Sequence, residues 1–81
     1  MKLKNKENRE AVEMMIETAA IAWANWQNNV ESSQALAAQY HAEYMAVAQC
    51  IDLFVTDTFG EIIGCIRQRG GEILRSETYL Y

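Results

Sequence analysis

The first part of the chain repeats apolar residues with the spacing of a helix. From position 12 onward they recur in steps of four and three, at Val12, Ile16, Ala19, Trp23, Trp26 and Val30. Because an α-helix makes one turn every 3.6 residues, this spacing places all of them on one side. Alanine, glutamate and methionine, which favour helix, fill many of the intervening positions. The pattern predicts a first helix over residues 6–29.

A tight turn is expected at residues 29–33. Asn29 suits the left-handed conformation in which many helices end. Ser32 or Ser33 suits the position before the next helix, because a serine hydroxyl accepts a hydrogen bond from a free N–H of the first helical turn. A short turn between two amphipathic segments predicts an antiparallel helical hairpin.

The second periodic segment is longer than the first. Its apolar face consists of Leu36, Tyr40, Tyr44, Val47, Ile51, Phe54, Thr58, Ile62 and Ile66. Taken as one helix, it covers residues 33–69 and is roughly 55 Å long at about 1.5 Å per residue. Poor helix formers cluster at residues 57–60, so a kink or break near Gly60 is an equal alternative.

Two glycines, Gly70 and Gly71, follow the second segment and are expected to end its helix. The remaining residues, 72–81, contain several apolar side chains and predict a short extended C-terminal arm. Two aromatic residues of this arm, Tyr79 and Tyr81, are candidates for contact with a partner, because tyrosine is enriched at binding surfaces. The whole chain, 1–81, is expected to form a single all-α domain.

The two predicted helices differ in length, and this has an energetic consequence. Residues 58–66 find no partner on the shorter first helix, so a straight second helix would expose Phe59, Ile62, Ile63 and Ile66. Each exposed side chain would forfeit about 1.5–3 kcal/mol of burial energy. Either the chain breaks and a third helix packs back, or a second subunit covers the overhang.

Small residues on the second segment favour the second subunit. Ala35, Ala42, Ala46, Leu53, Gly60 and Gly64 form a stripe that would let another helix approach closely. Met14 and Ile21 lie on the back of the first helix and also lack a partner there. We therefore expect a dimer or a higher oligomer, an oligomeric helical bundle. The predicted interface comprises Met14, Ile21, Ala42, Ala46, Leu53, Phe59, Gly60, Ile63 and Gly64.

Composition and charge narrow the range of partners. The chain has 81 residues, which is too short for a multidomain enzyme. Of these residues 51% are hydrophobic, and the net charge is −4. No Lys or Arg occurs between Glu10 and Ile66, so the body is acidic and nucleic acid is not an expected partner. The longest uncharged run, Thr18–Val30, is too short and too polar to span a bilayer, so no membrane partner is expected.

The cysteines indicate a compartment. Cys50 and Cys65 have neither metal-site nor redox-motif spacing and are expected to be reduced, which favours the cytoplasm. No signal peptide is expected either, because the basic first residues are followed by acidic ones rather than by an apolar run.

No set of residues suggests catalysis. The chain has one histidine, His41, and the residue three positions earlier is Ala38 rather than the Glu of a di-iron Glu-x-x-His pair. No serine or cysteine has the context of an activated nucleophile, and no glycine-rich phosphate loop is present. We expect no enzyme activity, no cofactor and no metal.

Aromatic side chains gather near the predicted turn: Trp23, Trp26, Tyr40 and Tyr44, with His41 beside them. At helical spacing they fit a core, and if partly open they could stack on a planar ligand or grip a peptide. The primary hypothesis is a small non-enzymatic homo-oligomer that acts by protein–protein interaction, as a regulator, adaptor or inhibitor of the kind carried by phages and mobile elements. The alternative is a ligand-binding helical oligomer with a pocket between subunits.

Overall fold

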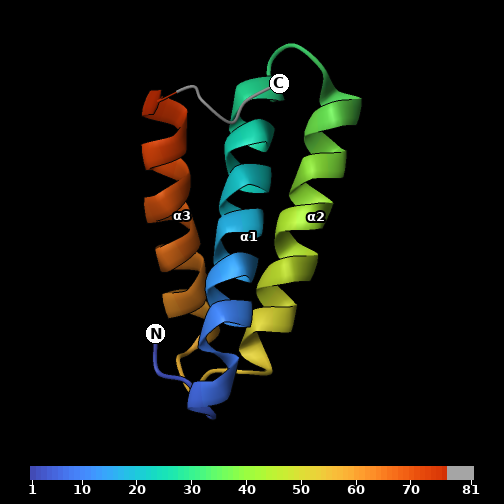
Figure 1. Cartoon of the computed structure of the whole chain (residues 1–81). Coiled ribbons are helices and arrows are strands. Elements are labelled where there is room, and N and C mark those ends of the chain that lie inside the picture. The colour runs from blue at the N-terminus through green and yellow to red at the C-terminus, as the bar shows by residue number, and fades with distance from the viewer. Residues whose placement is uncertain (77–81) are drawn as a thin grey trace.

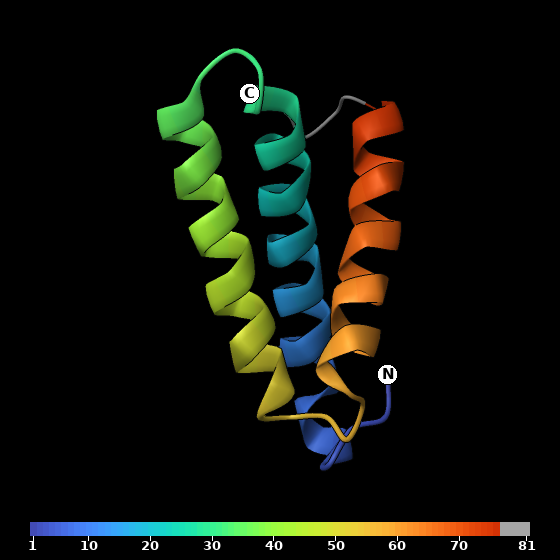
Figure 2. The same cartoon turned by 180° about the vertical axis from the view of Figure 1, so that it is seen from behind.

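A computed structural model of the chain describes residues 1–76. A short 3₁₀ turn, η1 (Lys6–Asn8), precedes three α-helices, α1 (Arg9–Asn29), α2 (Gln34–Asp52) and α3 (Phe59–Ser76). Figure 1 and Figure 2 show α1 in the middle, with α2 antiparallel to it on one side and α3 parallel to it on the other. The all-α prediction is confirmed, with three helices rather than two.

The first helix ends where the local signals predict, but it begins at Arg9 rather than at residue 6, because residues 6–8 form the 3₁₀ turn. Asn29 is not left-handed as expected: it is still helical, and Val30 after it also has right-handed helical dihedral angles. α1 ends at Asn29, and the backbone N–H of Ser33 donates to the Asn29 carbonyl at 2.9 Å. The Ser33 hydroxyl then accepts from the backbone N–H of Leu36 at 3.4 Å, as an N-cap of α2. Inside α1, the Asn29 side chain donates to the Asn25 carbonyl at 2.7 Å, so this buried amide is satisfied.

The prediction of one continuous helix over residues 33–69 is wrong. The chain leaves α2 at Asp52 and begins α3 at Phe59, so the break lies before Gly60, which is itself helical. Thr58 and Glu61 explain the new start, because they form a reciprocal capping box. The Thr58 backbone N–H donates to Glu61 Oε1 at 2.9 Å, and the Glu61 N–H donates to Thr58 Oγ1 at 3.2 Å.

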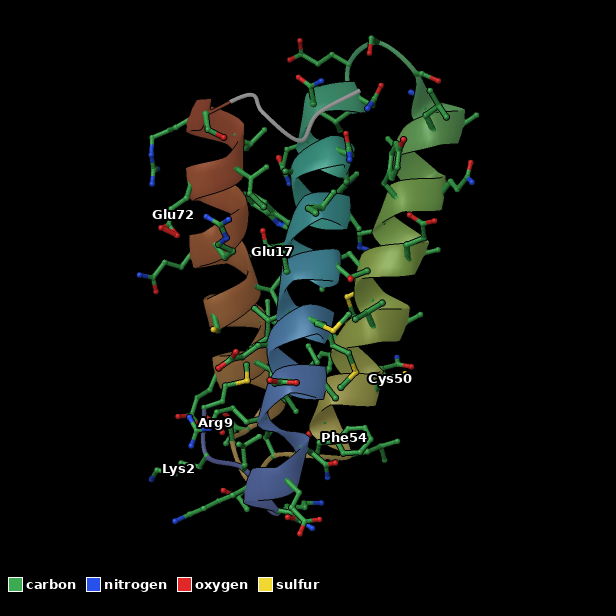
Figure 3. All side chains as sticks on the ribbon, viewed as in Figure 1. Lys2, Arg9, Glu17, Cys50, Phe54 and Glu72 are labelled. Atoms are coloured by element: carbon green, nitrogen blue, oxygen red, sulfur yellow. The ribbon has the colours of Figure 1, made fainter. Side chains whose placement is uncertain are left out.

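The N-terminal residues hold the break in place. Leu3 and Val55 form an isolated antiparallel β-bridge. The Lys4 N–H donates to the Phe54 carbonyl at 2.9 Å, and the Thr56 N–H donates to the Lys2 carbonyl at 2.8 Å. Residues 2–4 therefore supply partners for backbone groups that the interrupted helix leaves free. Figure 3 shows Lys2 and Phe54 at this same end of the bundle.

The expectation that Gly70 and Gly71 end the helix is also wrong, because α3 runs through both to Ser76. Gly70 is buried, and a Cβ atom added there would overlap the Trp23 ring. The glycine therefore serves a close approach between α3 and α1 rather than a helix terminus.

The predicted extended arm starts too early. Residues 72–76 form the last turns of α3, where Ile73 is fully buried and the Ser76 hydroxyl donates to its carbonyl at 2.9 Å. A side chain buried in the core at this position favours continued helix over an extended chain. Tyr79 and Tyr81, the candidate contacts on the arm, lie outside the described residues.

The break removes the overhang, because α3 folds back onto α1. Ile62 and Ile66, two of the residues expected to be exposed, are both 0% exposed. They join a core that also contains Val12, Ala19, Tyr44, Ala48, Ile51, Val55 and Ile73. The third-helix alternative is confirmed, and a second subunit is not needed to cover residues 58–66.

A side-chain ion pair also joins α3 to α1. Arg69 Nε and Nη2 donate to the two carboxylate oxygens of Glu17, each at 2.8 Å. Figure 3 places Glu17 between the two helices. The hydrogen bonds from Arg69 lower the pKa of Glu17 below its usual value. Across residues 1–76, no helix combines the length and the apolar character needed to cross a membrane.

Candidate functional site

A pocket of about 250 Å³ lies where all three helices meet, and we call it the aromatic pocket. Its lining is Trp23, Trp26 and Gln27 from α1, His41, Tyr44 and Met45 from α2, and Ile63 and Arg67 from α3. Figure 2 shows α2 and α3 diverging away from their connection on either side of α1. The pocket therefore forms where the two outer helices separate over the middle one.

Three rings in the lining are ordered by contact with one another. Trp26 and Tyr44 stack with centroids 6.0 Å apart and an interplanar angle of 17°. His41 meets the Trp26 ring edge-on at 4.6 Å and the Tyr44 ring edge-on at 5.8 Å. These are the offset and T-shaped arrangements that aromatic quadrupoles favour. The rings thus hold one another in fixed orientations at the wall of the pocket.

The polar side chains of the lining are Gln27 from α1, His41 and Tyr44 from α2, and Arg67 from α3. Arg67 brings a permanent positive charge, and no carboxylate of residues 1–76 lies within ion-pair distance of it. Tyr44 is 5% exposed, and this burial raises the pKa of its hydroxyl, while the charge of Arg67 opposes the rise. Of the eight lining residues, none is acidic.

Four of the predicted aromatic-site residues, Trp23, Trp26, His41 and Tyr44, come together here. Tyr40 is half-buried on α2 and does not line the pocket. The lining belongs to a single chain, so the pocket does not require the subunit boundary that the ligand-binding hypothesis assumed.

Gln27 was expected beside the aromatic cluster and does line the pocket, whereas sequence reasoning missed three of the lining residues as pocket residues: Met45, Ile63 and Arg67. Ile63 was assigned to an oligomer interface instead. Ile63 and Arg67 are four residues apart and share one face of a helix, a signal present in the sequence. The spacing alone does not predict that these two side chains line the pocket, because this depends on α3 packing against α1.

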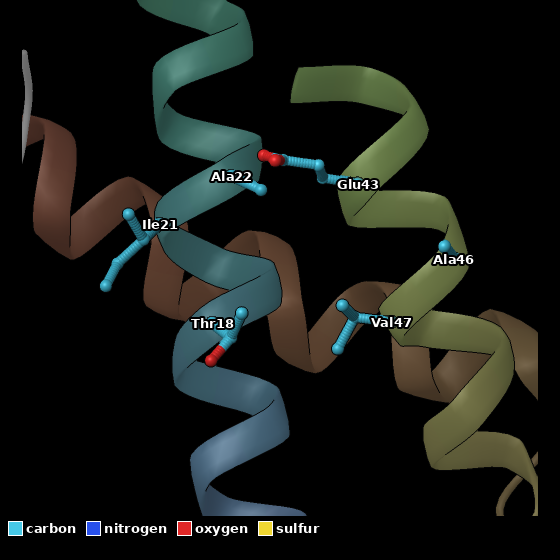
Figure 4. A pocket seen from close by; sticks show the side chains of 6 residues that line it. All are labelled: Thr18, Ile21, Ala22, Glu43, Ala46 and Val47. Atoms are coloured by element: carbon cyan, nitrogen blue, oxygen red, sulfur yellow. The ribbon is translucent and has the colours of Figure 1, made fainter. Parts of the chain in front are cut away.

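A second hollow lies between α1 and α2, and we call it the α1–α2 groove. It has a volume of about 420 Å³ and is lined by Thr18, Ile21, Ala22, Glu43, Ala46 and Val47. Figure 4 shows Glu43 of α2 reaching toward Ala22 of α1, with Val47 also directed toward α1. The Thr18 hydroxyl donates to the Met14 carbonyl at 2.9 Å. Glu43 is the one charged residue among the lining residues of the groove.

The residues of the predicted oligomer interface are spread over two regions. Met14 and Leu53 are 71% and 69% exposed, Ala42 and Ala46 are exposed, and Ile21 is half-buried in the groove. On α3, Phe59 and Ile63 pack against the core of their own chain. Gly60 and Gly64 are exposed, and a Cβ at Gly64 would meet no atom within 4 Å.

Metal-ligating and nucleophilic side chains do not converge in the described part of the chain. Residues 1–76 contain no group of three or more His, Cys, Asp and Glu side chains placed to hold a metal ion. Both cysteines are free, with Cys50 exposed on α2 and Cys65 half-buried on α3. What the structure does bring together is a set of aromatic and polar groups suited to binding.

Comparisons with protein-family models, with curated proteins and with solved structures found no match for this chain.

Proposed function

We propose that the chain is a non-enzymatic protein that forms a symmetric homodimer and acts by protein–protein interaction, as a regulator, adaptor or inhibitor. The observation that supports this proposal is the outer face of α2. We define that face by the exposed α2 residues Ala35, Ala38, Gln39, Ala42, Ala46, Gln49 and Cys50, together with Leu53, the exposed C-cap residue that follows the helix. None of them is charged, and they lie opposite the buried positions of the same helix.

The order of residues on this face favours a second copy as the occupant. The face is symmetric about position 44: Ala42 and Ala46 are equidistant from it, as are Gln39 and Gln49, and Ala35 and Leu53. A two-fold axis perpendicular to the helix brings one patch against itself in the opposite direction. In an antiparallel pair of α2 helices, the larger Leu53 of each copy would pack over the small Ala35 of the other.

Charge and burial support the same pairing. The chain carries a net charge of −4, so two copies repel unless they meet on a surface without charge. Leu53 is 69% exposed, and covering it would contribute about 1.5–3 kcal/mol per copy. The α1–α2 groove borders this face at Ala46, so the dimer would also cover part of an apolar hollow. Glu43 lies at the edge, where it stays solvated.

The two free cysteines fit a reducing environment, and we propose the cytoplasm as the place of action. In the antiparallel pair, Cys50 lies opposite Ala38 of the second copy and not opposite its own equivalent. The dimer is therefore expected to form without an intermolecular disulfide.

The test is the mass of the protein in solution. Sedimentation velocity at chain concentrations from about 1 μM to about 1 mM should show a monomer–dimer equilibrium for the native chain. The Ala46→Glu variant should shift that equilibrium to monomer, because it places a carboxylate near the two-fold axis. Ala11→Glu, at an exposed position of α1, is the matched control and should dimerise like the native chain.

Two results would contradict the proposal. One is a native chain that stays monomeric across the whole concentration range. The other is a native dimer that Ala46→Glu leaves intact while the circular dichroism spectrum shows native helix content, because the interface would then lie elsewhere.

A further inference from the structure

We propose that the aromatic pocket binds a small planar anion, an aromatic carboxylate of one or two rings. This inference goes beyond the proposed dimer and does not depend on it, because every lining residue belongs to one chain and none lies on the outer face of α2. The argument rests on the volume of the pocket, the order of its rings and the position of its charge.

The volume limits the size of the ligand. At about 250 Å³, the aromatic pocket is smaller than the 300–1,000 Å³ that is usual for sites of drug-sized molecules. One or two fused rings with a short polar group fit such a volume. A nucleotide or a lipid chain does not.

The rings determine the shape of the ligand. Trp26 and Tyr44 are nearly parallel, and His41 is fixed edge-on to both. A planar molecule finds ring faces and edges already oriented, so binding costs little side-chain ordering. An aliphatic ligand of equal volume would bury apolar area but gain no stacking energy.

The charge determines the sign of the ligand. Arg67 is the one permanently charged residue of the lining, and no carboxylate of the described chain pairs with it. Arg69, two residues later, differs because it is bound by Glu17 and lies near Glu72. A guanidinium is planar and presents paired donors that match a carboxylate. The rings alone would give the site no preference for an anion. Arg67 supplies that preference.

The geometry also allows both interactions in one molecule. Arg67 is an exposed residue one helical turn beyond Ile63 on α3, and it lines the same pocket as the rings of α1 and α2. Gln27, on the α1 side, adds an amide with both a donor and an acceptor. The overall acidity of the chain does not prevent binding, because at physiological salt charges are screened beyond about 8 Å.

The test uses 2-naphthoate as the probe and 2-naphthamide as its uncharged match. Both tryptophans of the chain line the pocket, so their indole N–H signals in a ¹H–¹⁵N spectrum report on it directly. We expect 2-naphthoate to shift both signals with saturation, and to bind at least tenfold more tightly than 2-naphthamide. Cyclohexanecarboxylate, a non-planar anion, should bind at least tenfold more weakly than 2-naphthoate.

Two variants identify the charge. Arg67→Gln should weaken 2-naphthoate binding at least tenfold and leave 2-naphthamide binding unchanged. Arg75→Gln, an exposed position on the same helix, is the matched control and should bind like the native chain. If Arg67→Gln loses structure, the comparison of 2-naphthoate with 2-naphthamide on the native chain decides the question alone.

The inference is overturned if 2-naphthoate shifts neither indole signal at millimolar concentration, or if the amide binds as tightly as the acid. It is also overturned if the shifts map to the α1–α2 groove. Sedimentation of the same samples reports the dimer separately, so failure of one proposal is distinguishable from failure of the other.

Discussion

The two ends of the bundle hold α2 and α3 together in different ways. At the lower end in Figure 1, residues 53–58 connect the two helices directly, and residues 2–4 pair with that connection through backbone hydrogen bonds. Farther from that connection, α2 and α3 diverge on either side of α1, and the aromatic pocket lies where side chains of all three helices meet. The covalent connection thus fixes the distance between α2 and α3 at one end of the bundle. Away from that end, the packing of side chains determines how far apart the two helices lie.

Two adjacent isoleucines on α3 give the largest expected contrast, which is between the packed core and the aromatic pocket. Ile62 is fully buried near the connection, whereas Ile63 lines the pocket and is half-buried. Ile62→Ala should lower the free energy of unfolding by about 2–5 kcal/mol, because it leaves a cavity in packed core. Ile63→Ala should cost less than about 1.5 kcal/mol, because the side chain already borders open space. Urea denaturation of both variants measures the difference.

Equal losses for the two isoleucine variants would break the comparison. They would mean that the pocket wall is packed as tightly as the core, and that the cavity beside Ile63 is closed in solution.

Two glycines on α3 give the next largest effect, with opposite signs. Gly70→Ala should destabilise the fold by about 1–3 kcal/mol, because the added methyl overlaps the Trp23 ring and α3 must move away. Gly64→Ala should stabilise it by about 0.5–1 kcal/mol, because an exposed glycine inside a helix loses more backbone entropy than alanine. Thermal unfolding followed by circular dichroism reports both.

The glycine pair sharpens the comparison if the indole signal of Trp23 moves in Gly70→Ala and stays in place in Gly64→Ala. A stabilising effect at both positions would show that α3 does not approach α1 closely at Gly70.

The ion pair between Glu17 and Arg69 gives the smallest effect, and it depends on pH. Arg69 lowers the pKa of Glu17 in the folded chain, so the pair adds stability above the ordinary pKa of glutamate. That stability is lost as the pH falls through the lowered folded pKa. Both side chains are 37% exposed, so solvent screening keeps the contribution at about 0–1 kcal/mol.

The measurement compares Glu17→Gln with the native chain at pH 7 and at pH 3. The difference in the free energy of unfolding should be small at pH 7 and smaller still at pH 3, because the stability that the pair adds is lost as the pH falls toward and through the lowered folded pKa. A difference that grows toward acid would contradict the assigned direction of the pKa shift.

The fold shows how far local patterns extend. The heptad spacing over Val12–Val30 and the cap at Ser33 are local features, and they correctly indicated where α1 ends and α2 begins. The continuous apolar periodicity through Phe54 and Thr58 was misleading, because it is compatible with one helix or two. The Thr58–Glu61 capping box was present in the sequence and decided between them once the chain end at Leu3 supplied a partner for Val55.

The candidate site shows the same limit. The aromatic residues of α1 and α2 were recognisable as a group, because helical spacing and a short turn bring them close. Arg67 was not, since its place in the pocket depends on α3 returning along α1. Gly70 was misread for a related reason. The sequence does not distinguish a glycine that permits contact with Trp23 from a glycine that ends a helix. Only the residue that packs against the glycine distinguishes the two roles.

The sequence by itself determined helix content, the first turn and the acidic charge of the body, because each depends on neighbours within a few residues. The tertiary structure alone decided that the second segment divides at residues 53–58 and that Ile62 and Ile66 are covered by their own chain. It also decided that three helices line a pocket whose one arginine has no carboxylate partner within residues 1–76. These features depend on contacts between residues more than forty positions apart, such as Leu3 with Val55 and Trp23 with Gly70. Such contacts form only where packing repays the entropy of closing a long loop, and hydrophobic periodicity does not encode that balance.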